Sequence, residues 1–214
     1  MMTVSLTCVG AEGQQVRLRR VQVSPPENTS LSASEYEALL DLMGSDNGTE
    51  LNSLYRTSVD GTTYNDLLDS VGDAEPLVFV IRKGKYVFGV FINCGLELPD
   101  DPTDWHKYDC DVWYFSLAGH FPKPTKIDID EGDHFVVVSG REGSLSGWAN
   151  AEIGGRLYLG FRPYIRSCMQ VTDSRYLPAG YTGERNEYGG AYLGGSYDFI
   201  ADEIEVLHVV GNSR

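Results

Sequence analysis

The stretch Leu193-Gly194-Gly195-Ser196-Tyr197-Asp198-Phe199-Ile200-Ala201-Asp202-Glu203-Ile204-Glu205-Val206 decides the fold of this 214-residue chain. It joins a glycine pair and two aromatic residues to an alternation of acidic and apolar residues. In an extended strand, successive side chains point to opposite faces. One face would carry Ile204, Val206, His208 and Val210, and the other Glu203, Glu205, Leu207 and Val209. Because an isolated strand cannot bury two such faces, we expect this segment to pair inside a sheet and to complete a core.

Composition and charge limit the class of protein. Hydrophobic residues make up 42% of the chain and charged residues 22%, which is ordinary for a globular protein. The net charge of -14 opposes binding to nucleic-acid phosphates and to anionic membrane surfaces. No apolar run approaches the roughly 20 residues that span a bilayer, and no signal peptide is visible. We therefore expect a cytoplasmic protein with no nucleic-acid partner and no direct membrane insertion.

Cysteine usage gives an expectation about redox state. Cys8, Cys94, Cys110 and Cys168 are widely spaced, and no Cys-x-x-Cys motif occurs. A chain of this length can bury a sizeable core without disulfide cross-links. We therefore expect reduced thiols in a cytoplasmic protein.

Two short segments have helical periodicity. In residues 34–43, Ser34 and Glu37 form the expected capping box. The apolar stripe of this segment comprises Tyr36, Leu39, Leu40 and Met43. A second helix is expected after Thr63, with Asp66 completing its capping box. Its buried side comprises Tyr64, Leu67, Leu68 and Val71.

Strand signals dominate the remainder of the chain. Residues 77–81 and 86–93 flank the tight turn Lys83-Gly84-Lys85, and both arms are apolar on nearly every residue, so both faces of this hairpin are expected to be covered. Further strands are expected at 3–9, 16–23, 51–57, 111–117, 122–129, 134–139 and 156–161, and loops at 98–111 and 162–192. The pattern predicts an α+β, predominantly β protein, a sandwich of two antiparallel sheets with short flanking helices. Residues 1–33 would form either an N-terminal extension or a strand pair and a linker, before a domain at 34–214.

No stretch of the chain assembles a convincing catalytic or metal site. Residues 128–133 are acidic, but an EF-hand count from Asp128 places Gly132 and Ser139 at ligand positions. Clustered carboxylates could hold a metal or act as an acid/base pair. Such a cluster comprises Asp100, Asp101, Asp104, Asp109 and Asp111 with His106. The histidines His106, His120, His134 and His208 lack zinc-ligand spacing. We therefore expect no catalytic residue, no metal and no cofactor.

Two other function classes stay open. A small redox-reactive or hydrolytic enzyme could use Cys94, Cys110 or the clustered carboxylates. A calcium- or glycan-binding β-sandwich could use residues 128–133 and the tyrosines of the C-terminal third. These tyrosines are Tyr176, Tyr181, Tyr188, Tyr192 and Tyr197.

Four stretches between residues 51 and 210 carry a resemblance to a known family. They are Leu54-Tyr55-Arg56-Thr57-Ser58-Val59-Asp60-Gly61, the hairpin at 76–90, Trp113-Tyr114-Phe115-Ser116-Leu117 and the closing stretch at 193–206. In order and spacing they resemble the TLDc domain family. The residues that match its structural motifs are Tyr55, Arg56, Gly61, Phe88, Gly89, Gly194 and Gly195. Val90 stands where the family often has glycine, and residues 162–187 resemble an insertion.

The resemblance to the TLDc family implies a β-sandwich without an established catalytic mechanism. It also implies protection from oxidative stress and binding to the vacuolar proton-pumping ATPase (V-ATPase). Glu203 and Glu205 match acidic positions of the family and are candidate partner-binding residues, with a charged strand face or a structural ion pair as the alternative. The implied function is a non-catalytic protein-interaction module that a V-ATPase subunit recruits from the cytoplasm to endomembranes.

Overall fold

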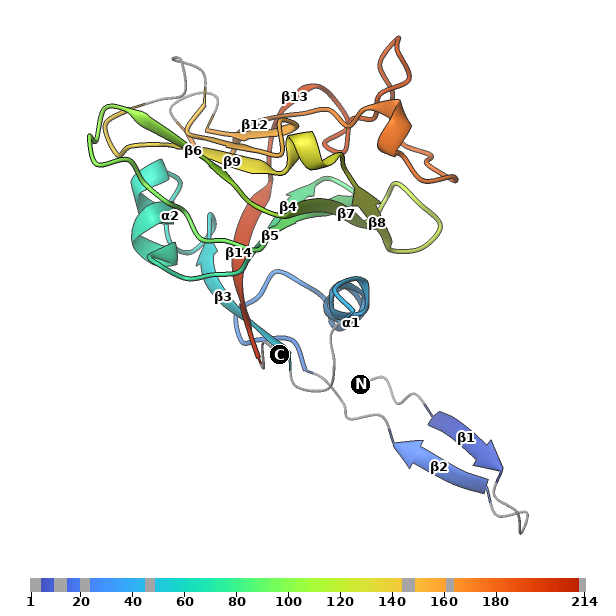
Figure 1. The fold of residues 1–214 in the computed structure, drawn as a ribbon. Helices are drawn as coiled ribbons and strands as arrows, with labels where there is room; N and C mark the ends of the chain where they lie inside the picture. The colour runs from blue at the N-terminus through green and yellow to red at the C-terminus, as the bar shows by residue number, and fades with distance from the viewer. Residues whose placement is uncertain are drawn as a thin grey trace.

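Two six-stranded antiparallel sheets stack face to face in the computed structural model (Figure 1). The structure describes residues 5–9, 15–19, 24–44, 49–143, 149–160 and 164–211, with side chains from residue 24 onward. The first sheet has the order β3 (Glu50–Arg56), β14 (Glu203–Val210), β4 (Leu77–Lys83), β5 (Tyr86–Ile92), β7 (Val112–Ala118) and β8 (Thr125–Asp128). The second has the order β13 (Asp198–Ile200), β12 (Ser167–Gln170), β11 (Leu157–Leu159), β10 (Ala151–Ile153), β9 (Phe135–Ser139) and β6 (Trp105–Asp109). The expected predominantly β sandwich is confirmed.

Short helices and a separate strand pair complete the described parts of the chain. The helices are α1 (Ala33–Leu42), α2 (Tyr64–Val71) and the 3-10 turns η1 (Glu131–Asp133) and η2 (Ser174–Tyr176). The strand pair consists of β1 (Ser5–Val9) and β2 (Gln15–Arg19), which pair antiparallel with each other as expected. Helix α1 lies on the outer face of the first sheet, away from the second sheet (Figure 1).

Strand β14 lies in the interior of the first sheet. It pairs antiparallel with β3 on one side and with β4 on the other. Ile204 and Val206 point into the core between the two sheets, whereas Leu207 joins the second core beneath α1. Both faces that the alternation predicted are therefore buried as far as Leu207, whereas His208 and Val209 are partly buried and Val210 is exposed.

The β4–β5 hairpin is covered on both faces, as its continuous apolar run predicted. Residues 77–81 are all buried. Phe79 and Ile81 pack between the sheets, and Val78 and Val80 pack beneath α1. Because each face meets a different layer, no polar residue is needed along this stretch.

The predicted start is confirmed for one helix and wrong for the other. Helix α2 begins as predicted, with the capping box of Thr63 and Asp66. The capping box of α1 consists of Ser32 and Glu35, so the prediction of Ser34 and Glu37 is wrong by two residues. The motif Ser-x-x-Glu occurs twice in this segment, and in the structure Glu35 of the earlier motif also pairs with Arg82 of β4 at 2.6 Å.

Several short strands of the second sheet were not predicted from the sequence. Residues 98–111 were expected to be a loop but contain β6, and 162–192 contain β12. Strand β10 was not expected either. These strands have three to five residues and depend on their neighbours, since β6 pairs with β9 and β10 lies between β9 and β11. Local periodicity over so few residues carries little signal.

Candidate functional site

Glu203 stands at the start of β14, and its carboxylate accepts hydrogen bonds from the loop after β3. The Thr57 hydroxyl donates to Oε1 at 2.7 Å, the Ser58 N–H donates to Oε1 at 2.9 Å, and the Ser58 hydroxyl donates to Oε2. Arg56 Nη2 lies 3.0 Å from Oε2 and forms an ion pair. Burial by itself would raise the pKa of Glu203, but the hydrogen bonds from Ser58, Thr57 and Arg56 lower it below its ordinary value.

Glu205 is fully buried, and it connects β14 to the segment before α1. Its Oε1 accepts from the Ser53 hydroxyl at 2.7 Å, and its Oε2 accepts from the Ser30 N–H at 2.8 Å. Arg56 Nη1 strengthens the same junction by donating to the Asn28 carbonyl at 2.7 Å. Both candidate glutamates thus have their oxygens occupied by this chain's own donors. The geometry favours the structural alternative, and partner binding through Glu203 and Glu205 stays a prediction.

The motif residues of the resemblance occupy packing positions. The Tyr55 hydroxyl donates to the Gly61 carbonyl at 2.8 Å and closes the turn between β3 and α2. A side chain at Gly194 would lie 2.3 Å from the ring of Phe199. The residues in such positions are Tyr55, Arg56, Gly61, Phe88, Gly89, Gly194 and Gly195. Arg56 also makes the ion pair with Glu203 and the hydrogen bond to Asn28 described above, and a functional role of these motif residues stays a prediction.

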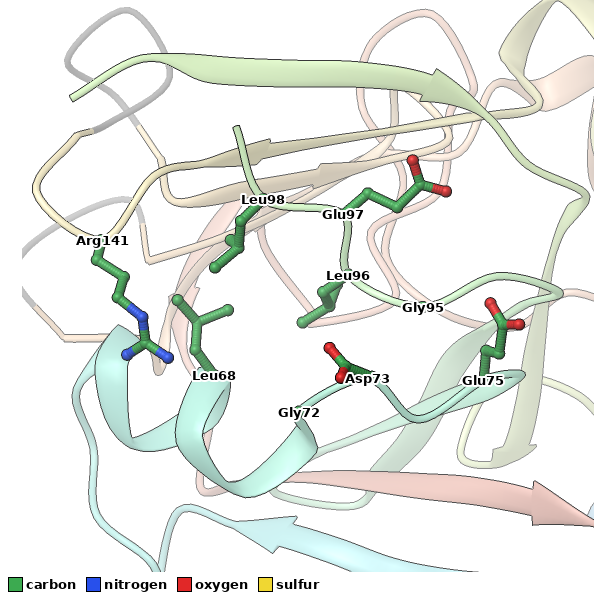
Figure 2. A pocket seen from close by; sticks show the side chains of 9 residues that line it. All are labelled: Leu68, Gly72, Asp73, Glu75, Gly95, Leu96, Glu97, Leu98 and Arg141. Atoms are coloured by element: carbon green, nitrogen blue, oxygen red, sulfur yellow. The ribbon is translucent and has the colours of Figure 1, made fainter. Parts of the chain in front are cut away.

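A cavity of about 340 Å³ lies at the C-terminal end of α2 (Figure 2). Its walls are formed by α2, the connection from α2 to β4, the segment after β5 and Arg141. The lining residues are Leu68, Gly72, Asp73, Glu75, Gly95, Leu96, Glu97, Leu98 and Arg141. Three leucines turn toward one another, and Asp73 lies beside them (Figure 2). Glu75 lies farther from the leucines, and the carboxylate of Glu97 turns away from them. No pattern in the sequence predicts this cavity, because the segments that form its walls are distant along the chain.

Cys94, which precedes the lining residue Gly95, forms a disulfide bond with Cys110, and their Cα atoms are 6.1 Å apart. The expectation of reduced thiols is therefore wrong for this pair. The two cysteines are brought together because β5 and β7 pair directly, with Ile92 opposite Val112. Cys168 is free and buried, and burial raises the pKa of its thiol. The side chain of Cys8 lies outside the described residues.

The Cys94–Cys110 bond should contribute measurably to stability. It closes a sequence separation of 16 residues, for which chain-entropy arguments give about 3 kcal/mol. We expect the double variant Cys94→Ser/Cys110→Ser to lose about 2–3 kcal/mol of unfolding free energy relative to the oxidised wild type. Urea unfolding with and without dithiothreitol measures this loss of unfolding free energy. The reduced wild type should have the same unfolding free energy as the variant. Equal stability of the oxidised wild type and the variant would refute it.

The structure does not assemble the clustered carboxylates of the β5–β7 connection. Asp101 accepts from the Thr103 N–H at 2.9 Å, and Asp104 accepts from the Trp105 N–H at 2.8 Å. Asp111 accepts from the Asn93 side chain at 2.8 Å. Within the part of the chain that the structure describes, no three His, Cys, Asp or Glu residues are grouped to hold a metal.

Residues 128–133 also make separate contacts. Asp128 pairs with Lys126 at 2.8 Å, and Asp133 pairs with Arg156 at 2.7 Å. Asp130 accepts from the hydroxyl of Tyr176. These carboxylates connect neighbouring segments of the fold, so their geometry adds nothing to the calcium alternative.

His120 is a buried imidazole to which the sequence assigned no role. Its ring stacks between Tyr86 and Tyr181, with centroid distances of 4.4 and 5.7 Å. Its Nδ1 lies 2.9 Å from the hydroxyl of Ser116, and its Nε2 is buried without a hydrogen-bond partner among the described residues. Burial lowers the pKa of His120 to about 4. Tyr86 and Tyr181 come from segments that are distant from His120 along the chain, whereas Ser116 is four residues before it. No motif spacing in the sequence pointed to this arrangement.

The His120 environment predicts acid sensitivity. The folded state holds a neutral ring with a pKa of about 4, against about 6.5 in an unfolded chain. Below pH 6.5 the unfolded chain binds a proton at His120 that the folded chain does not bind, so acid favours unfolding. The stability that depends on a neutral His120 is therefore complete above pH 6.5 and is lost as the pH falls toward 4. The shift corresponds to about 3 kcal/mol.

The matched reference for this pH dependence is His120→Phe, which cannot titrate at that position. We expect the unfolding free energy of the wild type, minus that of the variant, to fall by about 3 kcal/mol between pH 7 and pH 4. Denaturant unfolding at a series of pH values gives both curves. A difference that does not vary with pH would contradict a neutral buried His120.

Comparison with known proteins assigns the chain to a family. Within the described ranges, no helix is long and apolar enough to cross a membrane. A search of curated proteins found no match. The family model described as the TLDc domain matches residues 26–210, most of the chain. The match begins earlier than the resemblance at 51–210. It includes the residues before α1 that contact Glu205 and Arg56. The domain boundary at residue 34 stays a prediction. This chain belongs to the TLDc domain family.

Proposed function

We propose that this chain is a non-catalytic protein-interaction module that binds a subunit of the V-ATPase and contributes to resistance against oxidative stress. The observation that carries the proposal is the family match over residues 26–210. The proposed location is the cytoplasm, with recruitment to endomembranes through the protein partner.

The charge of the chain supports association with a basic partner surface. The net charge is -14, from 31 acidic and 17 basic residues. Such an excess steers association toward a positive patch and speeds the encounter at low ionic strength. The binding should therefore weaken as salt is added, because exposed charges are screened over about 10 Å at 0.1 M.

Affinity capture with defined components tests this proposal. The full-length chain is immobilised and incubated with purified V-ATPase, and the retained subunits are identified by mass spectrometry. We expect subunits of the pump at 50 mM salt and much less at 500 mM salt. An unrelated acidic protein of equal net charge is the control. Absence of the pump at low salt, or equal recovery on the control, would refute the proposal.

The disulfide bond favours a redox-reactive protein as a second candidate. Cys94 and Cys110 form a pair that can be reduced and reoxidised, and Cys94 is partly exposed. In a reducing cytoplasm such a bond opens unless an oxidant closes it. Labelling of the reduced chain with an iodoacetamide probe near neutral pH tests this candidate. Reactive thiols at these two positions would support it, and uniformly slow labelling would remove it.

A further inference from the structure

The cavity beside α2 combines an apolar floor with a negatively charged rim. Leu68 is buried, and Leu96 and Leu98 are partly buried against the same core. Asp73 and Glu75 are exposed at the rim, and within the described residues their carboxylates have neither an ion-pair nor a hydrogen-bond partner. An unpaired negative rim over apolar surface is complementary to a cation that has an aliphatic stem.

Arg141 also reaches this cavity, but its charge is already compensated. Its Nη1 lies 2.8 Å from Asp69 Oδ1 and 3.5 Å from Asn65 Oδ1. In Figure 2 its guanidinium turns toward α2. The positive charge is therefore paired on the surface of the helix and leaves Asp73 and Glu75 without a partner.

The end of helix α2 adds a second source of negative potential. The helix has eight residues and ends at the C-cap Gly72, which lines the cavity. Its last turn contains no basic residue. The carbonyl end of a helix carries a partial negative charge that stabilises a nearby cation. This backbone feature is independent of the rim carboxylates, and both favour the same kind of occupant.

The wall of the cavity is held in place before any ligand arrives. The Cys94–Cys110 bond fixes the start of the segment that carries Leu96 and Leu98. The Tyr108 hydroxyl donates to the carbonyl of Gly95 at 2.9 Å and accepts from the N–H of Glu97 at 3.2 Å. A preformed wall lowers the entropic cost of binding.

We propose that this cavity accepts a lysine or arginine side chain of a partner protein. The inference rests on the proposed function for its premise that the chain binds a protein. The aliphatic stem would lie on Leu68, Leu96 and Leu98, and the charged group would lie between Asp73 and Glu75. A volume of about 340 Å³ is at the lower end of ligand sites, which span roughly 300–1,000 Å³. It suits a side chain that enters from a neighbouring main chain.

Two labelled peptides test the charge requirement on the full chain. The first is fluorescein-labelled Gly-Leu-Arg-Leu-Gly-amide, and the second has citrulline, the neutral isostere, in place of arginine. Fluorescence anisotropy at 20 mM salt gives the affinities, and leucine methyl NMR locates the peptide. We expect binding of the arginine peptide, methyl shifts at leucines 68, 96 and 98, and at least about fivefold weaker binding of the citrulline peptide. Equal binding of both peptides, binding elsewhere or no binding overturns the proposal.

Charge variants on two sides of the molecule sharpen this test. Asp73→Asn/Glu75→Gln should weaken the arginine peptide about five- to tenfold and leave the citrulline peptide unchanged. The control Glu37→Gln/Glu50→Gln makes the same change of net charge on α1 and β3, and should leave both peptides unchanged. If both double variants weakened binding of the arginine peptide equally, the effect would come from the net charge of the chain, and the proposal would be overturned. All four substituted residues are at least partly exposed, so circular dichroism should show an unchanged fold.

A free cation distinguishes a protein side chain from a small amine. N-acetylarginine amide should compete with the arginine peptide at least about tenfold more weakly than the unlabelled peptide does, because it lacks the flanking leucines. Competition as strong as that of the peptide would mark a small-molecule site and overturn the proposal. The V-ATPase is absent from these assays. Peptide binding without capture of the pump would therefore refute only the proposed function, and capture without peptide binding would refute only the cavity inference.

Discussion

Deletion of residues 199–214 is expected to leave a chain that does not fold. The deletion removes β14, which lies between β3 and β4 and fills both cores. Burial of Ile204, Val206 and Leu207 is worth about 1.5–3 kcal/mol for each side chain. Their sum is a large part of the roughly 5–15 kcal/mol by which domains are stable.

The backbone makes the loss of β14 worse. Without this strand, β3 loses its partner and β4 exposes a long apolar edge, which favours aggregation. The donors that surround Glu205 would also lose their acceptor. No other described strand is adjacent to β3 in the sheet and could replace it.

Circular dichroism, thermal melting and sedimentation of the truncated chain check this expectation. The control deletion of residues 211–214 keeps every residue of β14 and should melt cooperatively. A soluble product of the longer deletion with a cooperative transition would contradict the central position of β14.

Gly89→Ala is expected to destabilise the chain by on the order of 3–5 kcal/mol. A Cβ atom at residue 89 would lie 1.9 Å from the carbonyl oxygen of Phe79 and 2.6 Å from the ring of Phe115. Real Cβ atoms essentially never come this close, so the backbone of β4 or β5 must shift. That movement would disturb the hairpin on which both cores depend.

The matched control for this substitution is Gly132→Ala in η1. No heavy atom lies within 4 Å of a Cβ at that position, so we expect a change within about 0.5 kcal/mol. Urea denaturation of the wild type and both variants gives the three unfolding free energies. A Gly89→Ala chain as stable as the control would show that the β4–β5 contact is looser than described.

Local features of this fold could be predicted from the sequence. The capping box of Thr63 and Asp66 links residues three positions apart, and the β4–β5 hairpin is closed by a two-residue turn. The alternation in β14 places Ile204 and Leu207 on opposite faces of the strand, as the pattern predicted, and the structure buries these faces in different cores. In each case the residues that decide the structure are neighbours along the chain, so their spacing carries the information.

The first capping box shows where a local pattern becomes ambiguous. Two overlapping Ser-x-x-Glu motifs are equally good as sequence signals. The structure uses Ser32 and Glu35, and Glu35 also reaches Arg82 of a strand that lies 47 residues further along the chain. A long-range ion pair thus coincides with one of two starts that the helix itself could not distinguish.

By itself the sequence determined the sandwich class, the hairpins and the family resemblance, because these follow from short-range periodicity and motif order. Only the tertiary structure decided that Cys94 meets Cys110, that His120 stacks between two tyrosines, and that Leu68 and Leu96 share a cavity with Asp73. Such groups are separated along the chain and are joined by strand pairing and burial. Those contacts are cooperative properties of the whole fold, and no single segment contains the information that specifies them.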